Sequence, residues 1–378
     1  DGRRQRVLLN IAPRHGKAID SDTPMLTHRG WIAARDVVEG DSLIAADGTW
    51  TKVLGIYPQG VTDAFRVSFD DNSSLVVSSD HKWAVLSAFQ RRKARGEWSP
   101  IPAYAGKTGP SVKQFAVKTT HELMGDLLET CAEKRAKWAI PTVPATPGDV
   151  HEADAYLIGY WLGDGHSQSA AITTMDSEVV EAFGARYELR AHKHQSAGLA
   201  TTYQVAGGFQ TVLGALGMLR NKNIPASVLR WSVECRKELI RGFMDADGGN
   251  TNNGAEITQK NEALVDALAT VVRSVGWRAR KTKKFNAEYS RDYYILSVSS
   301  TEVPFALSRK VASWRVPRSN KPYRFIESIE QVSDRETVCF AVEHADHLFA
   351  AGKALVVTHN TELGVKSLSS RIFAQNPR

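Results

Sequence analysis

Strand-like segments occur towards both ends of the chain, whereas a helical pattern lies between them. Residues 43–46 and 325–332 have the apolar content and spacing of short β-strands. Residues 261–275 instead place apolar side chains three and four positions apart, which predicts an amphipathic helix. We therefore expect a mainly β region contributed by both ends of the chain, interrupted by an α/β region.

A second helical pattern occurs twice in the middle of the chain, at residues 157–165 and 240–248. Each copy has two small residues four positions apart, so both lie on the same face of a helix. Small side chains on facing helices allow the two backbones to approach closely. The small residues are Gly159 and Gly163 in the first copy and Gly242 and Ala246 in the second.

An aspartate follows the small residues in each copy, Asp164 in the first and Asp247 in the second. We expect the two carboxylates side by side at the carboxyl ends of the helices, where the helix dipoles favour positive charge. Paired carboxylates there suit divalent cations.

Both copies resemble the LAGLIDADG motif of homing endonucleases. The resemblance implies that Asp164 and Asp247 bind Mg²⁺ or another divalent cation and that the domain cleaves double-stranded DNA. Residues 222–225 read Lys-Asn-Ile-Pro and resemble an element that supplies a lysine, here Lys222, to the nuclease site. The alternative is that the nuclease domain is inactive and the protein only splices. The presence of both aspartates, Asp164 and Asp247, favours an active nuclease.

The segment Thr358-His359-Asn360-Thr361 has the residues for cleavage and transfer at one peptide bond. The side-chain amide of Asn360 can attack its own backbone carbonyl, closing a succinimide and breaking the bond to Thr361. His359 can polarise that bond or protonate the leaving amine. The hydroxyl of Thr361 can hold an acyl group.

The two ends of the chain read as halves of one motif. Deleting residues 18–360 joins a buried strand, a loop and the sequence Gly16-Lys17-Thr361, which opens a helix. In this arrangement backbone amides and a lysine hold phosphates while a threonine binds Mg²⁺. The joined sequence Pro-Arg-His-Gly-Lys-Thr-Glu resembles the ATPase motif of phage large terminase subunits. The resemblance implies terminase-like host fragments, or exteins, at 1–17 and 361–378.

We interpret residues 18–360 as an insertion into the host protein. Within it, four segments resemble the splicing motifs of inteins, in the order found in that family. The first lies in residues 22–41, the second is Ser-Ser-Asp-His-Lys-Trp at 78–83, the third spans 337–349, and the last is 358–360. The resemblance implies a mainly β, horseshoe-shaped Hint fold. It also implies that Ser78 and His81 activate the peptide bond before the insertion.

The insertion begins with Ala18, whose methyl group cannot attack a carbonyl. Inteins of class 3 lack the first nucleophile and have a Trp, Cys and Thr triplet instead, matched here by Trp83, Cys339 and Thr358. A thiol with an ordinary pKa of about 8.5 can supply thiolate near neutral pH after a modest shift. The alternative is a class 1 intein whose initiating residue was replaced, leaving Ala18.

The first half of the mechanism implied by the class 3 resemblance is acyl transfer. Cys339 attacks the carbonyl of Lys17 and displaces Ala18, with assistance from His81. The acyl group then passes to the hydroxyl of Thr361.

The second half releases the insertion. Asn360 cyclises with assistance from His359 and His347, and the ester rearranges to an amide that joins Lys17 to Thr361. No cofactor is expected for splicing.

Domain boundaries follow from these motifs. We expect host fragments at 1–17 and 361–378, splicing segments at 18–120 and 323–360, a linker or DNA-contact region at 121–149, and the α/β nuclease at 150–315.

Composition and charge add limited information about partners. The net charge of +7 permits a DNA partner, and basic residues cluster at 91–95 and 278–284. Three cysteines without paired spacing argue against a disulfide framework. No secretory signal or long apolar run is seen, so we expect a soluble monomer without a membrane partner in the cytoplasm of an infected bacterial host.

The expected DNA target is the terminase gene site that lacks the insertion. Two other readings are a DNA-binding nuclease with inert flanks and a Hedgehog-like domain that cleaves without ligating. The motif His-Asn-Thr and the matching flanks argue against both.

Overall fold

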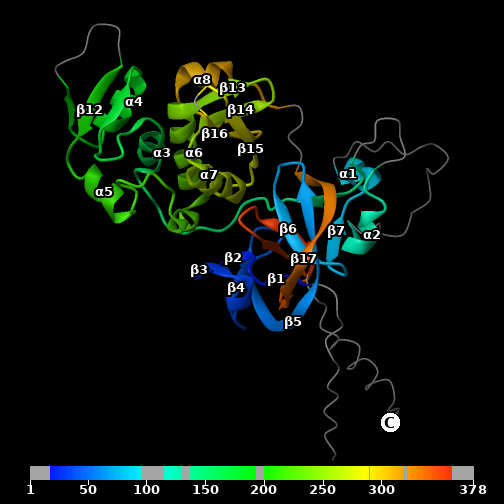
Figure 1. Cartoon of the computed structure of the whole chain (residues 1–378). Coiled ribbons are helices and arrows are strands. Elements are labelled where there is room, and N and C mark those ends of the chain that lie inside the picture. The colour runs from blue at the N-terminus through cyan, green and yellow to red at the C-terminus, as the bar shows by residue number, and fades with distance from the viewer. Residues whose placement is uncertain are drawn as a thin grey trace, which may run out of the picture.

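The computed structural model describes residues 18–94, 115–128, 136–192, 200–288, 290–317 and 322–359. Its elements form a β domain, built from both ends of the chain, and an α/β domain inserted between them (Figure 1). The predicted architecture, a mainly β domain interrupted by an α/β domain, is confirmed. No helix in the described part is both long and apolar enough to cross a membrane.

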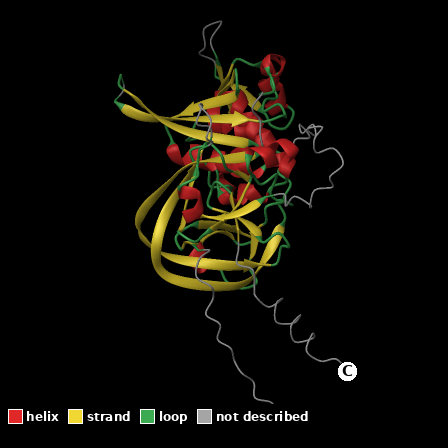
Figure 2. Ribbon diagram, turned by 90° about the vertical axis from the view of Figure 1, so that its right-hand side faces the viewer, coloured by secondary structure: helices red, strands yellow, loops and turns green. Residues whose placement is uncertain are grey.

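Two long antiparallel strands, each of 20 residues, form the frame of the β domain. They are β5 (Trp50–Phe69) and β17 (Tyr323–Val342), and irregularities in their register bend them. Figure 2 shows these curved strands below the helices of the other domain. Because β17 comes from the C-terminal segment, folding brings the N-terminal and C-terminal segments of the β domain into one sheet.

The main sheet has the strand order β3-β2-β4-β5-β6-β1-β17-β9. Its remaining strands are β1 (Ile19–Asp20), β2 (Pro24–Thr27), β3 (Gly30–Ala33), β4 (Ser42–Ile44), β6 (Ser74–Ser78) and β9 (Ala139–Pro141). Two hairpin-like pairs complete the domain: β7 (Lys82–Val85) with β8 (Ala116–Thr119), and β18 (Leu348–Ala351) with β19 (Val356–His359). The short helices are η1 (Ala34–Asp36), α1 (Ala88–Ala94) and α2 (Thr120–Met124).

Part of the predicted linker belongs to the β domain. Trp138 and Ile140 lie in its hydrophobic core, and β9 pairs with the beginning of β17. Helix α2 also packs on this domain, against β8. The interpretation of 121–149 as a linker or DNA-contact region is therefore wrong for these segments, because their apolar side chains are needed to close the core.

The α/β domain consists of two similar halves, each beginning with one of the repeated helices. The first half has α3 (Ala155–Asp164), β10 (Ile172–Thr174), α4 (Ser177–Gly184), β11 (Leu189–Ala191), β12 (Thr201–Val205), α5 (Phe209–Ala215) and η3 (Ala226–Arg230). The second has α6 (Val233–Asp247), β13 (Gly248–Thr251), β14 (Gly254–Gln259), α7 (Glu262–Ser274), β15 (Arg278–Asn286), β16 (Arg291–Ser299) and α8 (Ser308–Ser313). The sheet orders are β10-β12-β11 and β13-β14-β16-β15.

The predicted amphipathic helix is confirmed as α7. Asn261 caps it, since its side-chain oxygen accepts a hydrogen bond from the backbone N–H of Leu264 at 3.3 Å. Its apolar face is buried in the core of the α/β domain.

Candidate active sites

The first residue of the predicted insertion is buried between two strands. Ala18 is 1% exposed, and its carbonyl accepts a hydrogen bond from the backbone N–H of Ser78 at 3.0 Å. The backbone N–H of Ala18 donates to the hydroxyl of Ser78 at 3.3 Å. Ser78 therefore contacts the nitrogen that would leave when the bond before Ala18 is cleaved.

Cys339 lies across from Ala18 in the sheet. Strands β1 and β17 are antiparallel, with Ile19 opposite Val338 and Asp20 opposite Thr337. Continuing this register by one residue places Cys339 opposite Ala18. The thiol is free of disulfide bonding and buried. Lys17, whose carbonyl it would attack, is outside the described residues.

Tyr57 is the partner of Cys339 on the other side of β17. Burial raises the pKa of the Tyr57 hydroxyl, and the neighbouring charge of Cys339 adds to the rise. Tyr57 therefore stays protonated near neutral pH beside the candidate nucleophile.

His81, Trp83 and Thr358 form one buried cluster, although they come from opposite ends of the chain. The Nε2 atom of His81 is hydrogen-bonded to the Oγ1 atom of Thr358, and both residues are fully buried. The Trp83 ring packs against the His81 ring, with centroids 4.9 Å apart and planes at 71°. The structure thus brings the predicted Trp and Thr positions together around the motif histidine.

His347 and His359 lie at the end of the β18–β19 pair that leads to the second junction. His359 is opposite Leu348 in the register, and His347 precedes Leu348 directly. The Nδ1 atom of His347 is buried without a hydrogen-bond partner among the described residues. Asn360 and Thr361 are outside those residues, so their roles remain predictions.

The nuclease candidate site begins at the contact between α3 and α6. A Cβ atom on Gly159 would lie 2.1 Å from the carbonyl oxygen of Leu239, and one on Gly242 would lie 2.0 Å from that of Tyr156. Any larger side chain would force the helices apart. The predicted backbone-to-backbone approach of the two helices is confirmed.

Asp164 is the last residue of α3 and Asp247 the last residue of α6, and the two lie close to each other. Burial raises the pKa of both carboxyl groups, and the charge of Asp164 raises the pKa of Asp247 further. Gln259 donates a hydrogen bond to Asp247. Two partly buried carboxylates that repel each other fit a divalent cation, which would relieve the repulsion.

The two aspartates would not fill a metal coordination shell alone. Within the described residues, no group of three or more His, Cys, Asp or Glu side chains could hold a metal ion. Further oxygen ligands would come from backbone carbonyls, water or DNA phosphate, which is how Mg²⁺ is commonly held in enzymes acting on phosphates.

Two lysines, Lys222 and Lys310, lie beside the aspartates. The sequence motifs predicted only Lys222. Lys222 donates to the carbonyl of Gly163 at 2.8 Å; burial lowers its pKa, while Asp247 and Asp164 oppose that shift. The second is Lys310 in α8, whose ammonium donates to carbonyls at the end of α6. These are the carbonyls of Met244 at 2.8 Å, Asp245 at 2.6 Å and Gly248 at 2.8 Å. Lys310 lies in no motif, and only the fold brings it to the helix end.

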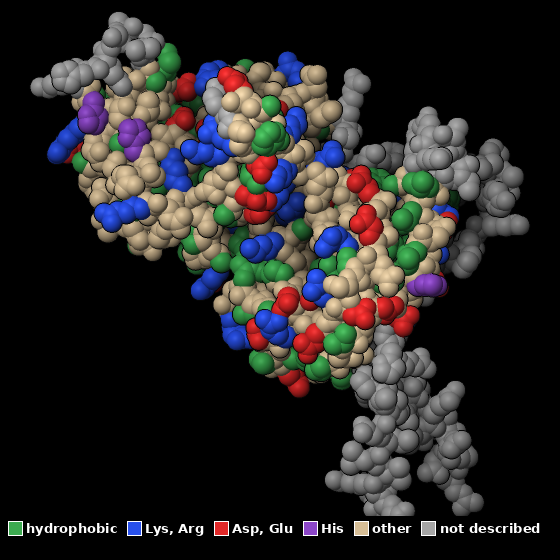
Figure 3. Space-filling view, in the orientation of Figure 1, with side chains coloured by type: hydrophobic (Ala, Val, Ile, Leu, Met, Phe, Trp, Pro, Cys, Tyr) green, Lys and Arg blue, Asp and Glu red, His purple; other side chains and the backbone are tan. Residues whose placement is uncertain are grey.

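The predicted phosphate contacts of the basic segment 278–284 are limited by ion pairs. Arg278 pairs with Asp70 of the β domain, and Lys281 pairs with Glu262 and Asp266 on α7. Arg280 and Lys284 are exposed. On the face drawn in Figure 3, basic and acidic side chains are interspersed. In the other basic cluster, Arg91 is buried and donates to the carbonyls of Leu86 and Lys137.

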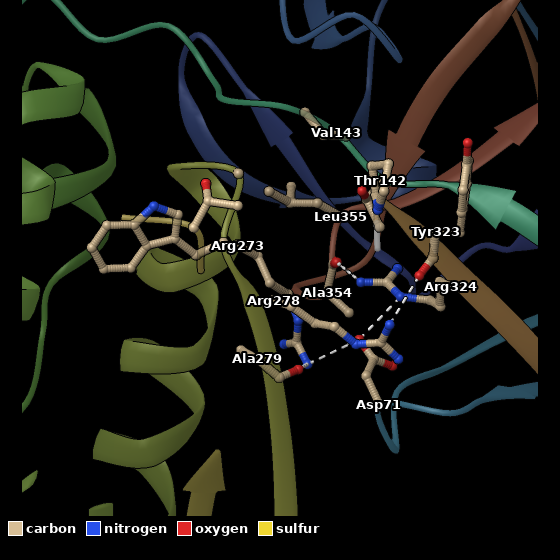
Figure 4. Close-up of a pocket in the computed structure, with 14 residues that line it drawn as sticks. Asp71, Thr142, Val143, Arg273, Arg278, Ala279, Tyr323, Arg324, Ala354 and Leu355 are labelled. Carbon is tan, nitrogen blue, oxygen red and sulfur yellow. Dashed lines mark hydrogen bonds and ion pairs between the residues drawn. The ribbon is translucent and has the colours of Figure 1, made fainter. Parts of the chain in front are cut away.

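A charged cavity of about 260 Å³ lies where the two domains meet (Figure 4). Asp71 of the β domain pairs there with Arg324 of β17 and Arg273 of α7. Burial by itself would raise the pKa of Asp71, but the two arginines outweigh it and lower the pKa to about 2. Asp71 therefore joins the domains electrostatically.

Comparison with known proteins supports the division into these sites. Residues 234–304 match the family model described as LAGLIDADG-like domain. The match begins within α6 and includes the four-stranded sheet. The family match supports a LAGLIDADG-like domain within the α/β part of the chain.

Curated relatives are proteins of DNA replication. The replicative DNA helicase DnaB of Mycobacterium intracellulare is 31% identical over 96% of this chain, and that of Mycobacterium leprae is 26% identical over 46%. The chain spans 62% of the first helicase and 28% of the second. The first match exceeds the share occupied by residues 18–360, so it extends into the flanks. These relatives do not support the predicted phage terminase host.

Solved structures with some likeness fall into two groups. A crystal structure of the MchDnaB-1 intein covers 91% of this chain and 100% of its own, with 12% identity and a TM-score of 0.28. The homing endonuclease I-DmoI in complex with DNA and Ca covers 42% of this chain and 95% of its own, with 15% identity and a TM-score of 0.31.

Proposed function

We propose that residues 18–360 excise themselves by protein splicing and join Lys17 to Thr361. The observation that carries this proposal is the register of β1 and β17, which puts Cys339 opposite Ala18. A residue that cannot attack begins the insertion, and a buried thiol lies beside it. The expected product is a ligated flank peptide, detected by intact mass after expression.

In the first step, the thiolate of Cys339 attacks the carbonyl carbon of Lys17. A C–S bond forms, the C–N bond to Ala18 breaks, and the Ala18 nitrogen takes up a proton. The hydroxyl of Ser78 accepts a hydrogen bond from the Ala18 N–H and so orients the leaving nitrogen, and the proton lost when the Cys339 thiol ionises balances the one taken up. His81 assists the step from the adjacent buried cluster.

In the later steps, the Thr361 hydroxyl attacks the thioester, so a C–O bond forms and the C–S bond breaks. The side-chain nitrogen of Asn360 then attacks its own carbonyl and breaks the bond to Thr361, with His359 and His347 as acid–base groups. The freed Thr361 amine attacks the ester carbonyl, so the amide C–N bond to Lys17 forms while the ester C–O bond breaks and the Thr361 hydroxyl is restored.

The intact mass also separates the alternatives. Unligated flank fragments indicate a domain that only cleaves, as in the Hedgehog-like reading. An unchanged mass indicates a precursor that cannot react, including a class 1 intein in which the first nucleophile was lost at Ala18.

The α/β domain has a second proposed activity, site-specific cleavage of double-stranded DNA. Asp164 and Asp247 would hold Mg²⁺ or another divalent cation, which would activate water and stabilise charge on the phosphate. Lys222 and Lys310 add positive charge beside the two carboxylates. The experiment is cleavage of DNA that carries the uninterrupted host sequence, with and without a chelator.

The host is a phosphate-binding-loop ATPase interrupted between Lys17 and Thr361. The flanking sequence Pro-Arg-His-Gly-Lys-Thr-Glu supports a phage terminase subunit, with its uninterrupted gene as the DNA target. The similarity to a replicative DNA helicase over 96% of the chain supports a helicase host instead. Reading the coding sequence beyond both ends of this chain decides between them, because only the flanks belong to the host.

A further inference from the structure

Thr120 makes three hydrogen bonds to the segment that contains His81 and Trp83. Its hydroxyl accepts the indole N–H of Trp83 at 3.0 Å and donates to the carbonyl of His81 at 3.3 Å. Its backbone N–H donates to the same carbonyl at 2.8 Å. Thr120 is fully buried, so water cannot replace these contacts.

The position of Thr120 is itself fixed by the start of α2. Thr119 caps the helix, and its hydroxyl and backbone exchange hydrogen bonds with Glu122 at 3.1 and 2.7 Å. The next backbone N–H, that of His121, donates to the carbonyl of Ser79 at 2.9 Å. The first turn of α2 therefore holds the whole segment from Ser79 to Trp83.

The contacts of Thr120 fix the position of the His81 imidazole in two ways. The Trp83 ring lies edge-on to the His81 ring, so the hydrogen bond that sets the indole plane also sets one wall of the imidazole site. The two bonds to the His81 carbonyl fix the backbone from which the imidazole extends. On its other side, the imidazole is bonded to Thr358.

We propose that Thr120 is a positioning residue for N-terminal cleavage, holding Trp83 and His81 in the arrangement that assists Cys339. This inference rests on the proposed splicing function. None of the four splicing motifs contains Thr120, and it acts only through other residues. Its hydroxyl should therefore affect the N-terminal step more than the cyclisation of Asn360.

The test compares three full-length precursors with the unmodified chain. Thr120→Val removes the hydroxyl at nearly constant volume, and Thr120→Ser keeps it. Thr27→Val is the matched control, because the buried Thr27 hydroxyl also bonds to a backbone carbonyl, that of Gly30 at 2.9 Å, but contacts neither His81 nor Trp83. N-terminal and C-terminal cleavage rates are measured by mass spectrometry across pH, together with melting temperature.

Thr120→Val removes both hydrogen bonds of the buried hydroxyl, and it should slow N-terminal cleavage by about tenfold or more and change its pH profile. Thr120→Ser should restore the rate and the profile, and Thr27→Val should change neither. An unchanged N-terminal rate in Thr120→Val would overturn the proposal. So would an equal loss in both cleavage rates, or loss of folding in Thr120→Val alone, since each indicates a purely structural role. If the unmodified chain does not react at all, it is the splicing proposal that fails.

Discussion

The Nε2 atom of His81 and the Oγ1 atom of Thr358 share a hydrogen bond between residues 277 positions apart. His81 lies in the turn that follows Ser78, the residue that contacts Ala18, and Thr358 lies on strand β19. The bond therefore links the environments of the two predicted splice junctions.

Replacing Thr358 should disturb this link selectively. Thr358→Val removes the hydroxyl and leaves the fully buried His81 Nε2 without that partner, so N-terminal cleavage should fall about tenfold or more. Thr358→Ser should retain most of the activity because it keeps the hydroxyl. Rates of release of the N-terminal fragment check this, and equal rates in the Val variant and the parent would refute a role for the bond.

The motifs at the splice junctions were predictable because each has a local sequence signal. Sequence motifs identified His81 and the triplet of Trp83, Cys339 and Thr358. The fold places these residues near Ala18 or around His81. The contacts of Thr120 and Lys310 were not predictable, because single residues from distant elements supply them. The pairing of Arg278 with Asp70 is similar, since 208 positions separate the two.

The same distinction applies to the domains. The paired helices could be predicted from small residues at fixed spacing, whereas residues 139–141 join the β domain through long-range pairing with β17. The terminase host was predicted from short flanks alone, and the helicase relatives do not support it.

Asp164→Asn and Asp247→Asn should each abolish DNA cleavage and leave splicing unchanged. Each change removes one of the charges that would hold the divalent cation, and neither residue contacts the β domain site. Glu234→Gln is the control, because this exposed carboxylate lies in the first turn of the same helix as Asp247. The measurement is cleavage of DNA carrying the uninterrupted host site. If either Asn variant cuts at the parental rate, the metal assignment is wrong.

Asp71→Asn should weaken the contact between the domains in a pH-dependent way. The folded-state pKa of about 2 lies below the ordinary value of 3.8, so the stabilisation is fully present above pH 4 to 5 and is lost as pH falls towards 2. A shift of this size corresponds to about 2 kcal/mol of unfolding free energy. Denaturation at pH 7 and pH 3 measures it.

The loss in Asp71→Asn should therefore be larger at pH 7 than at pH 3. Asp70→Asn is the matched control, since the neighbouring Asp70 is less buried and pairs with Arg278. A loss that is the same at both pH values would show that the charge of Asp71 is not the cause.

Full-length precursor should lack ATPase activity until it splices, because the insertion separates Lys17 from Thr361. Thr361→Ala should lose both splicing and ATP hydrolysis, since acyl transfer and Mg²⁺ binding each require a hydroxyl there. Thr361→Ser should retain much of each. ATP turnover is compared between two forms of the host protein. One has spliced, and the other still carries the insertion because Asn360 has been replaced. Comparable turnover by the two would contradict the interrupted-loop interpretation.

Cys339 is the central residue of the proposed splicing reaction, because Ala18 cannot initiate it. The most direct measurement is the intact mass of products from the unmodified chain and from Cys339→Ala, with Cys235→Ala as the control for loss of another buried cysteine that forms no disulfide. The unmodified chain and the control should yield residues 1–17 joined to 361–378, while Cys339→Ala should show no cleavage between Lys17 and Ala18. N-terminal cleavage at the parental rate in Cys339→Ala would contradict its assignment as the first nucleophile.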